Sequence, residues 1–207
     1  MGSASSTALL LEVVAAERAP ESGSTRIELV TSGPDAAGST RDTGVIPREL
    51  FASAERRVLI VGFAVHQGRE IFAVLGERMR LSPDLTVRVC LDVRRNPGDT
   101  TRDEALLRRF AERFPKHEWP GPKAPEVFYD PRSLIEGDAL RASLHAKCVV
   151  ADGERIYIGS ANFTEAAQLR NIEIGVAVRA AGTALAIEGH FAALIERGHL
   201  RRLPLLC

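Results

Sequence analysis

The sequence predicts an α/β protein, built as an α/β/α sandwich with a central mixed β-sheet. Residues 57–65 (RVLIVGFAV) form a continuous apolar run, which is typical of a strand covered on both faces. Residues 69–81 show helical spacing of apolar side chains, and residues 85–93 (LTVRVCLDV) are again strand-like. This βαβ unit predicts two parallel strands joined by a right-handed crossover.

The rest of the chain supplies further strands and helices. Residues 26–31 alternate like a strand that stops at the turn residues Ser32, Gly33 and Pro34. Further strands are expected at residues 126–129, 144–151, 155–160 and 171–178. Helices are expected at residues 47–53, 103–114, 164–169 and 183–197, and Gly-, Ser- or Pro-rich loops at residues 35–44, 115–125 and 131–142. The turn residues Asp152 and Gly153 predict an antiparallel hairpin, which makes the sheet mixed.

The length and composition of the chain limit how it can be organised into domains. Its 207 residues suffice for one substantial domain, which we expect at residues 25–207 after an N-terminal segment at residues 1–24. No apolar run approaches the roughly 20 residues of a membrane span, so no membrane partner is expected. The three cysteines lie far apart and match neither a disulfide framework nor a zinc spacing, which predicts a reducing, cytoplasmic setting.

The charges of the chain are balanced, with 27 basic and 27 acidic residues. Since nonspecific affinity for nucleic acid comes mainly from neutralising phosphates, this balance argues against strong unassisted binding, and any polyanion site must be local. Two arginine-rich stretches are most simply explained as solvated helix faces: Arg94, Arg95, Arg102, Arg108 and Arg109, and then Arg201 and Arg202.

Side chains suited to phosphate chemistry gather around the predicted hairpin. His145 and Lys147 are two residues apart on a predicted strand, so an imidazole and an ammonium share one face. Across the hairpin, Gly159 permits close backbone approach, and Ser160 and Asn162 offer a hydroxyl and an amide for phosphate oxygens. These residues predict a binding site for a phosphate group.

The last predicted strand adds an acidic side chain to this region. Asn171 and Glu173 are two residues apart, so they share a face that could meet the histidine. Asp152 lies at the hairpin turn, where a structural role is the simpler interpretation.

Together these residues read H-x-K-x4-D-x6-G-S-x-N, which resembles the HKD motif of the phospholipase D superfamily. Glu173 follows His145 by 28 positions, where small bacterial nucleases of this superfamily place a glutamate that hydrogen-bonds the catalytic imidazole. The other four histidines lack the companion residues of a second motif. The chain is therefore similar to the single-motif group, in which two identical chains join their motifs across a twofold axis.

The resemblance implies a role for each residue of the motif. His145 would attack phosphorus to give a phosphohistidine, and His145 of the partner subunit would protonate the leaving oxygen. Lys147, Ser160 and Asn162 would hold the phosphate oxygens, so that neither a metal nor another cofactor is needed. Glu173 would orient the imidazole, while Asp152 and Gly159 would be structural. Asn171 is a candidate for a supporting contact behind the site, because it shares the face of Glu173 on the predicted strand.

Three functions fit this resemblance. The leading hypothesis is a homodimeric nuclease acting on DNA or RNA. The alternatives are a noncatalytic nucleic-acid-binding subunit of a larger complex, and a phospholipase or phosphatidyl transferase. The overall layout is also similar to the small phospholipase D-like component of DISARM, a bacterial antiphage defence system, which implies further subunits as partners.

Overall fold

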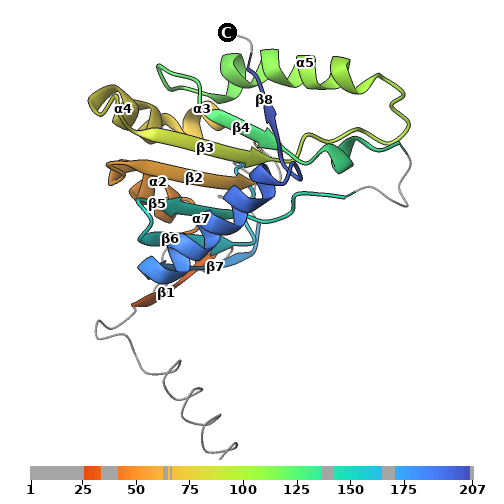
Figure 1. Ribbon diagram of the computed structural model, residues 1–207. Coiled ribbons are helices and arrows are strands. Elements are labelled where there is room, and N and C mark those ends of the chain that lie inside the picture. The colour runs from red at the N-terminus through yellow and green to blue at the C-terminus, as the bar shows by residue number, and fades with distance from the viewer. Residues whose placement is uncertain are drawn as a thin grey trace, which may run out of the picture.

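A mixed β-sheet forms the centre of the computed structural model, which describes residues 26–33, 42–62, 65, 67–136, 142–164 and 171–205 (Figure 1). Within these residues the strand order is β1-β7-β6-β5-β2-β3-β4-β8. The strands are β1 (Ile27–Ser32), β2 (Arg57–Gly62), β3 (Thr86–Leu91), β4 (Glu126–Tyr129), β5 (Cys148–Ala151), β6 (Arg155–Gly159), β7 (Glu173–Arg179) and β8 (Arg201–Leu203). Strands β2, β3 and β4 are parallel, and the other neighbours are antiparallel.

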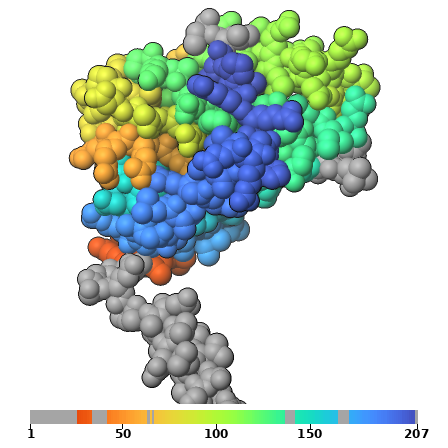
Figure 2. All heavy atoms as spheres, viewed as in Figure 1, coloured from red at the N-terminus to blue at the C-terminus, as the bar shows by residue number. Residues whose placement is uncertain are grey.

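Helices cover both faces of this sheet, which confirms the predicted sandwich. The helices are α2 (Val45–Ala52), α3 (Gly68–Ile71), α4 (Ala73–Leu81), α5 (Asp103–Arg113) and α7 (Ala181–Glu196). Side chains of α2, α4 and α5 join the core on one face, and α7 packs on the other. In Figures 1 and 2, α7 runs across the sheet face that is turned towards the viewer.

The central strand β2 explains the apolar run that begins at residue 57, because both of its faces are buried. Val58 and Ile60 enter the core beneath α2 and α4, whereas Leu59 and Val61 enter the core beneath α7. A strand buried on both faces needs apolar residues at successive positions, because successive side chains point to opposite faces. The parallel pairing of β2 with β3 confirms the βαβ unit.

Several predicted boundaries were wrong, and tertiary packing explains them. The helix predicted at residues 69–81 is interrupted at Phe72, whose buried ring lies 5.6 Å from Trp119 and 5.9 Å from Phe163, centroid to centroid. A π-helical turn, Phe114–Glu118, continues α5 into the predicted loop. Strand β8 was missed, because its three residues carry no periodic pattern and are held by pairing with β4.

The interpretation of the arginine-rich stretches as solvated helix faces was wrong for four of their residues. Arg94 is exposed but lies on the loop after β3. Arg95 is only 3% exposed, and its guanidinium donates to the carbonyl oxygens of Leu134 and Asp99. It therefore fixes the loop after β3. Arg201 and Arg202 lie on the edge strand β8. The predicted helix at residues 164–169 and the predicted N-terminal segment lie largely or wholly outside the described residues.

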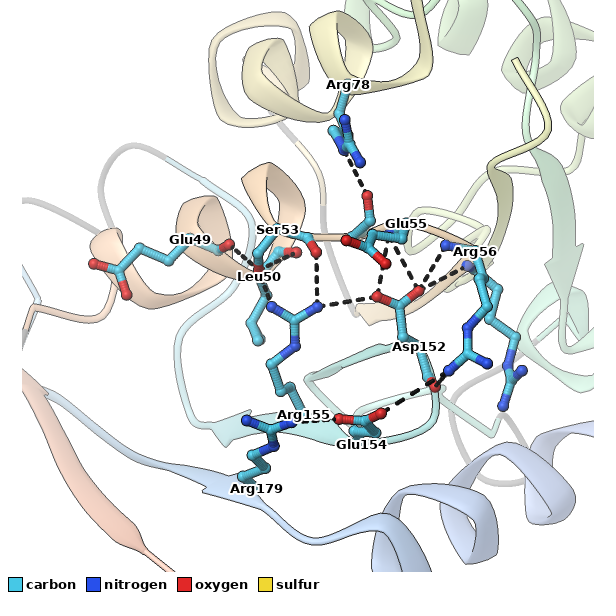
Figure 3. A network of polar contacts seen from close by, with 12 residues as sticks. Glu49, Leu50, Ser53, Glu55, Arg56, Arg78, Asp152, Glu154, Arg155 and Arg179 are labelled. Carbon is cyan, nitrogen blue, oxygen red and sulfur yellow. Dashed lines mark hydrogen bonds and ion pairs between the residues drawn. The ribbon is translucent and has the colours of Figure 1, made fainter. Parts of the chain in front are cut away.

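The turn of the β5–β6 hairpin is tied to the start of β2 by one carboxylate. Asp152 accepts hydrogen bonds from the backbone N–H groups of Glu55 at 3.1 Å, Arg56 at 2.8 Å and Arg57 at 3.1 Å, and from the guanidinium of Arg155 at 3.0 Å (Figure 3). The residue is 7% exposed and has a positive φ of 56°. These contacts support a structural role for Asp152.

Candidate active site

The motif residues meet at one end of three neighbouring strands. His145 and Lys147 lie just before β5, because the predicted strand at residues 144–151 begins only at Cys148. The pairing nevertheless extends to Lys147, whose carbonyl oxygen accepts the N–H of Gly159 at 3.1 Å. Ser160 follows β6 and donates its N–H to the carbonyl of Ile174 in β7 at 2.9 Å. The sheet thus brings the three parts of the motif together.

His145 and Lys147 form a close pair. The Lys147 ammonium donates to the carbonyl oxygen of His145 at 2.8 Å and lies 3.2 Å from Nδ1 of its ring. The imidazole is exposed, whereas Lys147 is only 6% exposed. The ammonium also lies 3.3 Å from Nε2, so a positive charge adjoins both nitrogens of the imidazole ring.

Burial perturbs the ammonium of this pair. Desolvation lowers the pKa of Lys147 below the ordinary value of 10.5, and the nearby Glu173 carboxylate opposes this shift. Since the charged form is the one that holds a phosphate, Lys147 combines a positive charge with a water-poor position. Such positions strengthen electrostatic interactions with a substrate.

An NMR titration of the lysine side chains is expected to show this shift directly. The Lys147 signal should titrate below 10.5 and move to still lower pH in Glu173→Gln, because the substitution removes the opposing charge. The exposed lysines Lys116 and Lys123 serve as internal references in the same spectra. A Lys147 pKa at or above 10.5 would contradict the assignment.

Glu173 is bound to two of its predicted neighbours. The Ser160 hydroxyl donates to its carboxylate, and the side-chain amide of Asn171 donates to Oε1 at 3.1 Å. Ser160 Oγ also accepts the N–H of Ile174 at 3.1 Å. Among the described residues, Ser160 and Asn171 donate hydrogen bonds to the Glu173 carboxylate. That Glu173 orients the His145 imidazole therefore stays a prediction.

Glycine at position 159 is required by the packing below it. A Cβ atom there would lie 2.4 Å from the hydroxyl oxygen of Tyr157, which is far too close. Burial raises the pKa of Tyr157 to about 12, so the phenol is neutral beneath the site. Asn162 lies on the loop beyond Ser160, and its buried Oδ1 has no hydrogen-bond partner among the described residues.

The sequence did not indicate one carboxylate beside the motif. Asp92 directly follows β3, is buried, and accepts the N–H of Leu144 at 3.1 Å. Burial raises its pKa, while that hydrogen bond and the nearby charges of Arg94 and His145 act in the opposite direction. The only available signal was a polar residue at the carboxyl end of an apolar strand.

An open cavity of about 640 Å³ lies between the motif and α7. It is lined by His145, Lys147 and Ser160 of the motif, by apolar side chains such as Ile158 and Phe191, and by the polar side chains of Thr183 and His190 on α7. Among the residues that the structure describes, no cluster of His, Cys, Asp and Glu side chains could hold a metal ion. None of the described helices is long and apolar enough to cross a membrane.

The fold and this site define an α/β domain of the phospholipase D type that carries one motif. The chain belongs to the family described as cardiolipin synthase, PLD-like domain, whose model matches residues 48–195. It is thus a phosphodiesterase domain of the phospholipase D superfamily. No curated protein matches the sequence.

Solved structures share this fold at low sequence identity. The phospholipase D family member Nuc from Salmonella typhimurium has a TM-score of 0.54 and 18% identity, over 86% of this chain and 97% of that chain. NucT from Helicobacter pylori has a TM-score of 0.53 and 11% identity, over 83% and 97%. Phosphatidylserine synthase from Haemophilus influenzae has a TM-score of 0.61 and 17% identity, over 86% and 39%. These similarities establish the common architecture.

Proposed function

We propose that this chain is a metal-independent nuclease that acts as a homodimer through a phosphohistidine. The observation that carries the proposal is the His145–Lys147 pair, with Ser160 and Asn162 following the adjacent strand. An imidazole nitrogen beside a buried ammonium supplies a nucleophile and a phosphate-binding charge in one place.

The reaction would proceed in two displacements. An imidazole nitrogen of His145 attacks phosphorus, the bond to the leaving oxygen breaks, and that oxygen takes a proton from His145 of the partner subunit. The partner's imidazole, now neutral, removes a proton from water, which attacks the phosphohistidine and breaks the phosphorus–nitrogen bond. Lys147 opposes the negative charge that develops on the non-bridging oxygens in both steps.

A second copy of the chain is part of the proposal, because one motif provides one histidine and the reaction uses two. Exposed aliphatic side chains next to the motif support such an association. Ile158 on β6 is 44% exposed, Ile174 on β7 is 59% exposed, and Ile172 just before β7 is 83% exposed. Adjacent exposed apolar groups mark surfaces that proteins bury on association.

The boundaries and setting of the protein are part of the same proposal. We infer one catalytic domain at residues 25–207 in a cytoplasmic protein, and a role in antiphage defence, with other subunits of a defence system as partners. The balanced charge supports this role, since a protein with little intrinsic affinity for nucleic acid can be delivered to it by partners.

Phospholipid hydrolysis or phosphatidyl transfer is the second candidate function. The apolar cavity beside His145 and Lys147 favours it, because an acyl chain could occupy such a surface. The family description and the likeness to a phosphatidylserine synthase point in the same direction.

The test is an assay of the purified protein on single- and double-stranded DNA, on RNA and on phospholipid vesicles, each with and without EDTA. We expect hydrolysis of a nucleic acid that persists in EDTA, together with an acid-labile phosphohistidine after rapid quenching. Light scattering should give the mass of a dimer. Hydrolysis of vesicles alone would favour the lipid function, and binding of nucleic acid without turnover would favour a noncatalytic role.

A further inference from the structure

His145 does not lie on a strand, so its position depends on the irregular segment 142–147 that carries it. The downstream end of this segment is fixed by pairing with β6, because the carbonyl oxygen of Lys147 accepts the N–H of Gly159 at 3.1 Å. His145 precedes this pairing by two residues. The placement of its imidazole therefore also depends on what holds the segment upstream.

A buried carboxylate holds the segment at the residue before His145. Asp92 directly follows β3, is 8% exposed, and accepts the backbone N–H of Leu144 through Oδ1 at 3.1 Å. Asp92 is itself tied to the end of β2, because its own N–H donates to the carbonyl oxygen of Gly62 at 3.3 Å. The carboxylate therefore connects the carboxyl ends of two parallel strands with the segment that carries the histidine.

Leu144 is fixed through its side chain as well as through its N–H group. The side chain is buried in the core beneath α7, in the same cluster as Cys148 and Phe191. A buried N–H group that loses its acceptor pays the free energy of its desolvation, so the backbone shifts to find another partner. Without the Asp92 acceptor, such a shift at Leu144 would move His145 as well.

Asp92 also lies close to the imidazole itself. Burial is the largest effect on the pKa of the Asp92 carboxyl and raises it, and the charge of His145 is among the effects that oppose this rise. The Glu173 carboxylate, by contrast, accepts hydrogen bonds from Ser160 and Asn171. Asp92 is thus a carboxylate whose hydrogen bond acts on the backbone next to the reacting histidine.

We propose that Asp92 is a positioning residue for the nucleophile, which holds the N–H of Leu144 so that the His145 imidazole faces the scissile phosphodiester. The inference rests on the proposed role of His145 and adds a residue that lies outside the H-x-K-x4-D-x6-G-S-x-N pattern. Attack on phosphorus depends on the placement of the attacking atom, and a misplacement of about 1 Å can lower the rate about 100-fold.

Two substitutions of Asp92 test this assignment. Asp92→Ala removes the acceptor, whereas Asp92→Asn keeps an amide oxygen that can accept the same N–H. The constants kcat and KM are measured for bis-p-nitrophenyl phosphate, a small diester, and for the substrate that the wild-type protein hydrolyses best. We expect Asp92→Ala to lower kcat about 100-fold and to leave KM within about threefold, because the phosphate-binding side chains are unchanged. Asp92→Asn should restore kcat to within about fivefold of the wild-type value.

The matched control is Ser133→Ala, which removes buried hydrogen bonds in the same region but not on segment 142–147. The Ser133 hydroxyl donates to the carbonyl oxygens of Val93 at 2.8 Å and Asp130 at 2.7 Å. Both alanine variants should lower the melting temperature by roughly 5 °C, but kcat of Ser133→Ala should stay within about twofold of wild type. An equal fall of kcat in the two alanine variants, or no recovery of kcat in Asp92→Asn, would overturn the assignment.

Failure of the proposed function would show as a wild-type protein that hydrolyses neither substrate. The position of the imidazole is then followed by NMR, through the ¹H–¹³C signal of the His145 ring, which is assigned by its absence in His145→Ala. This signal should move in Asp92→Ala, return towards the wild-type position in Asp92→Asn, and stay in place in Ser133→Ala. An unmoved signal in Asp92→Ala would overturn the positioning role.

Discussion

Replacing His145 with alanine is expected to lower kcat for phosphodiester hydrolysis by at least about 10⁴-fold, because the substitution removes the nucleophile and the general acid together. The measurement is the initial rate on the substrate that the wild-type protein hydrolyses best. His145 is exposed, so the variant should keep the wild-type melting temperature to within about 2 °C. A variant that retains a tenth of the activity would show that His145 is neither the nucleophile nor the general acid.

Mixed dimers provide the control for the twofold site. When wild-type and His145→Ala chains are refolded together, only a pair of wild-type chains holds both histidines. Activity is then expected to fall with the square of the wild-type fraction. A linear fall would mean that each chain works alone, and the second histidine would have no part in the mechanism.

The order of the strands and helices could be predicted because local patterns agree with the final packing. Strand β2 is apolar at successive positions because both of its faces are covered, and the Asp152–Gly153 turn has two residues with positive φ, as hairpin turns of this kind require. The break at Phe72 and the short strand β8 depend on partners far away in sequence. Such long-range contacts leave no local pattern in the sequence, so they could not be predicted from it.

The candidate site was predicted only in part, for a similar reason. The spacing of His145 and Lys147 correctly indicated that their side chains meet, because alternation along an extended chain is a local property. The position of Asp92 beside Leu144 depends on how β3 and β5 flank β2 in the sheet. Likewise, the hydrogen bond from Ser160 to Glu173 depends on the register of β6 and β7, which the motif does not encode.

Replacing Asp152 with asparagine is expected to lower the free energy of unfolding by about 3 kcal/mol, while His145 and Lys147 stay unchanged. The carboxylate accepts three backbone N–H groups at the start of β2 and pairs with Arg155, and a neutral amide cannot replace these charge-assisted bonds. Asparagine tolerates a positive φ, so the loss reports on charge rather than on backbone strain. Urea denaturation at neutral pH measures the difference.

The pH dependence of the lost unfolding free energy shows whether the charge of the Asp152 carboxylate causes it. Burial alone would raise the pKa of Asp152, but the N–H groups of Arg56, Arg57 and Glu55 and the charge of Arg155 outweigh it and hold the pKa below 3.8. A lowered folded-state pKa means that the stabilisation is complete above 3.8 and is lost as the pH falls through the folded value. The difference between wild type and Asp152→Asn should therefore shrink only below about pH 4.

The control for this experiment is Glu154→Gln, two residues further along the same turn. Glu154 pairs with Arg179 at 2.9 Å, but the two side chains are 40% and 75% exposed. Solvent-exposed pairs contribute little, so the expected loss is at most about 0.5 kcal/mol at any pH. Equal losses in the two variants would mean that the hairpin turn is stabilised by general surface charge, and Asp152 would then lose its role as the anchor between the hairpin and β2.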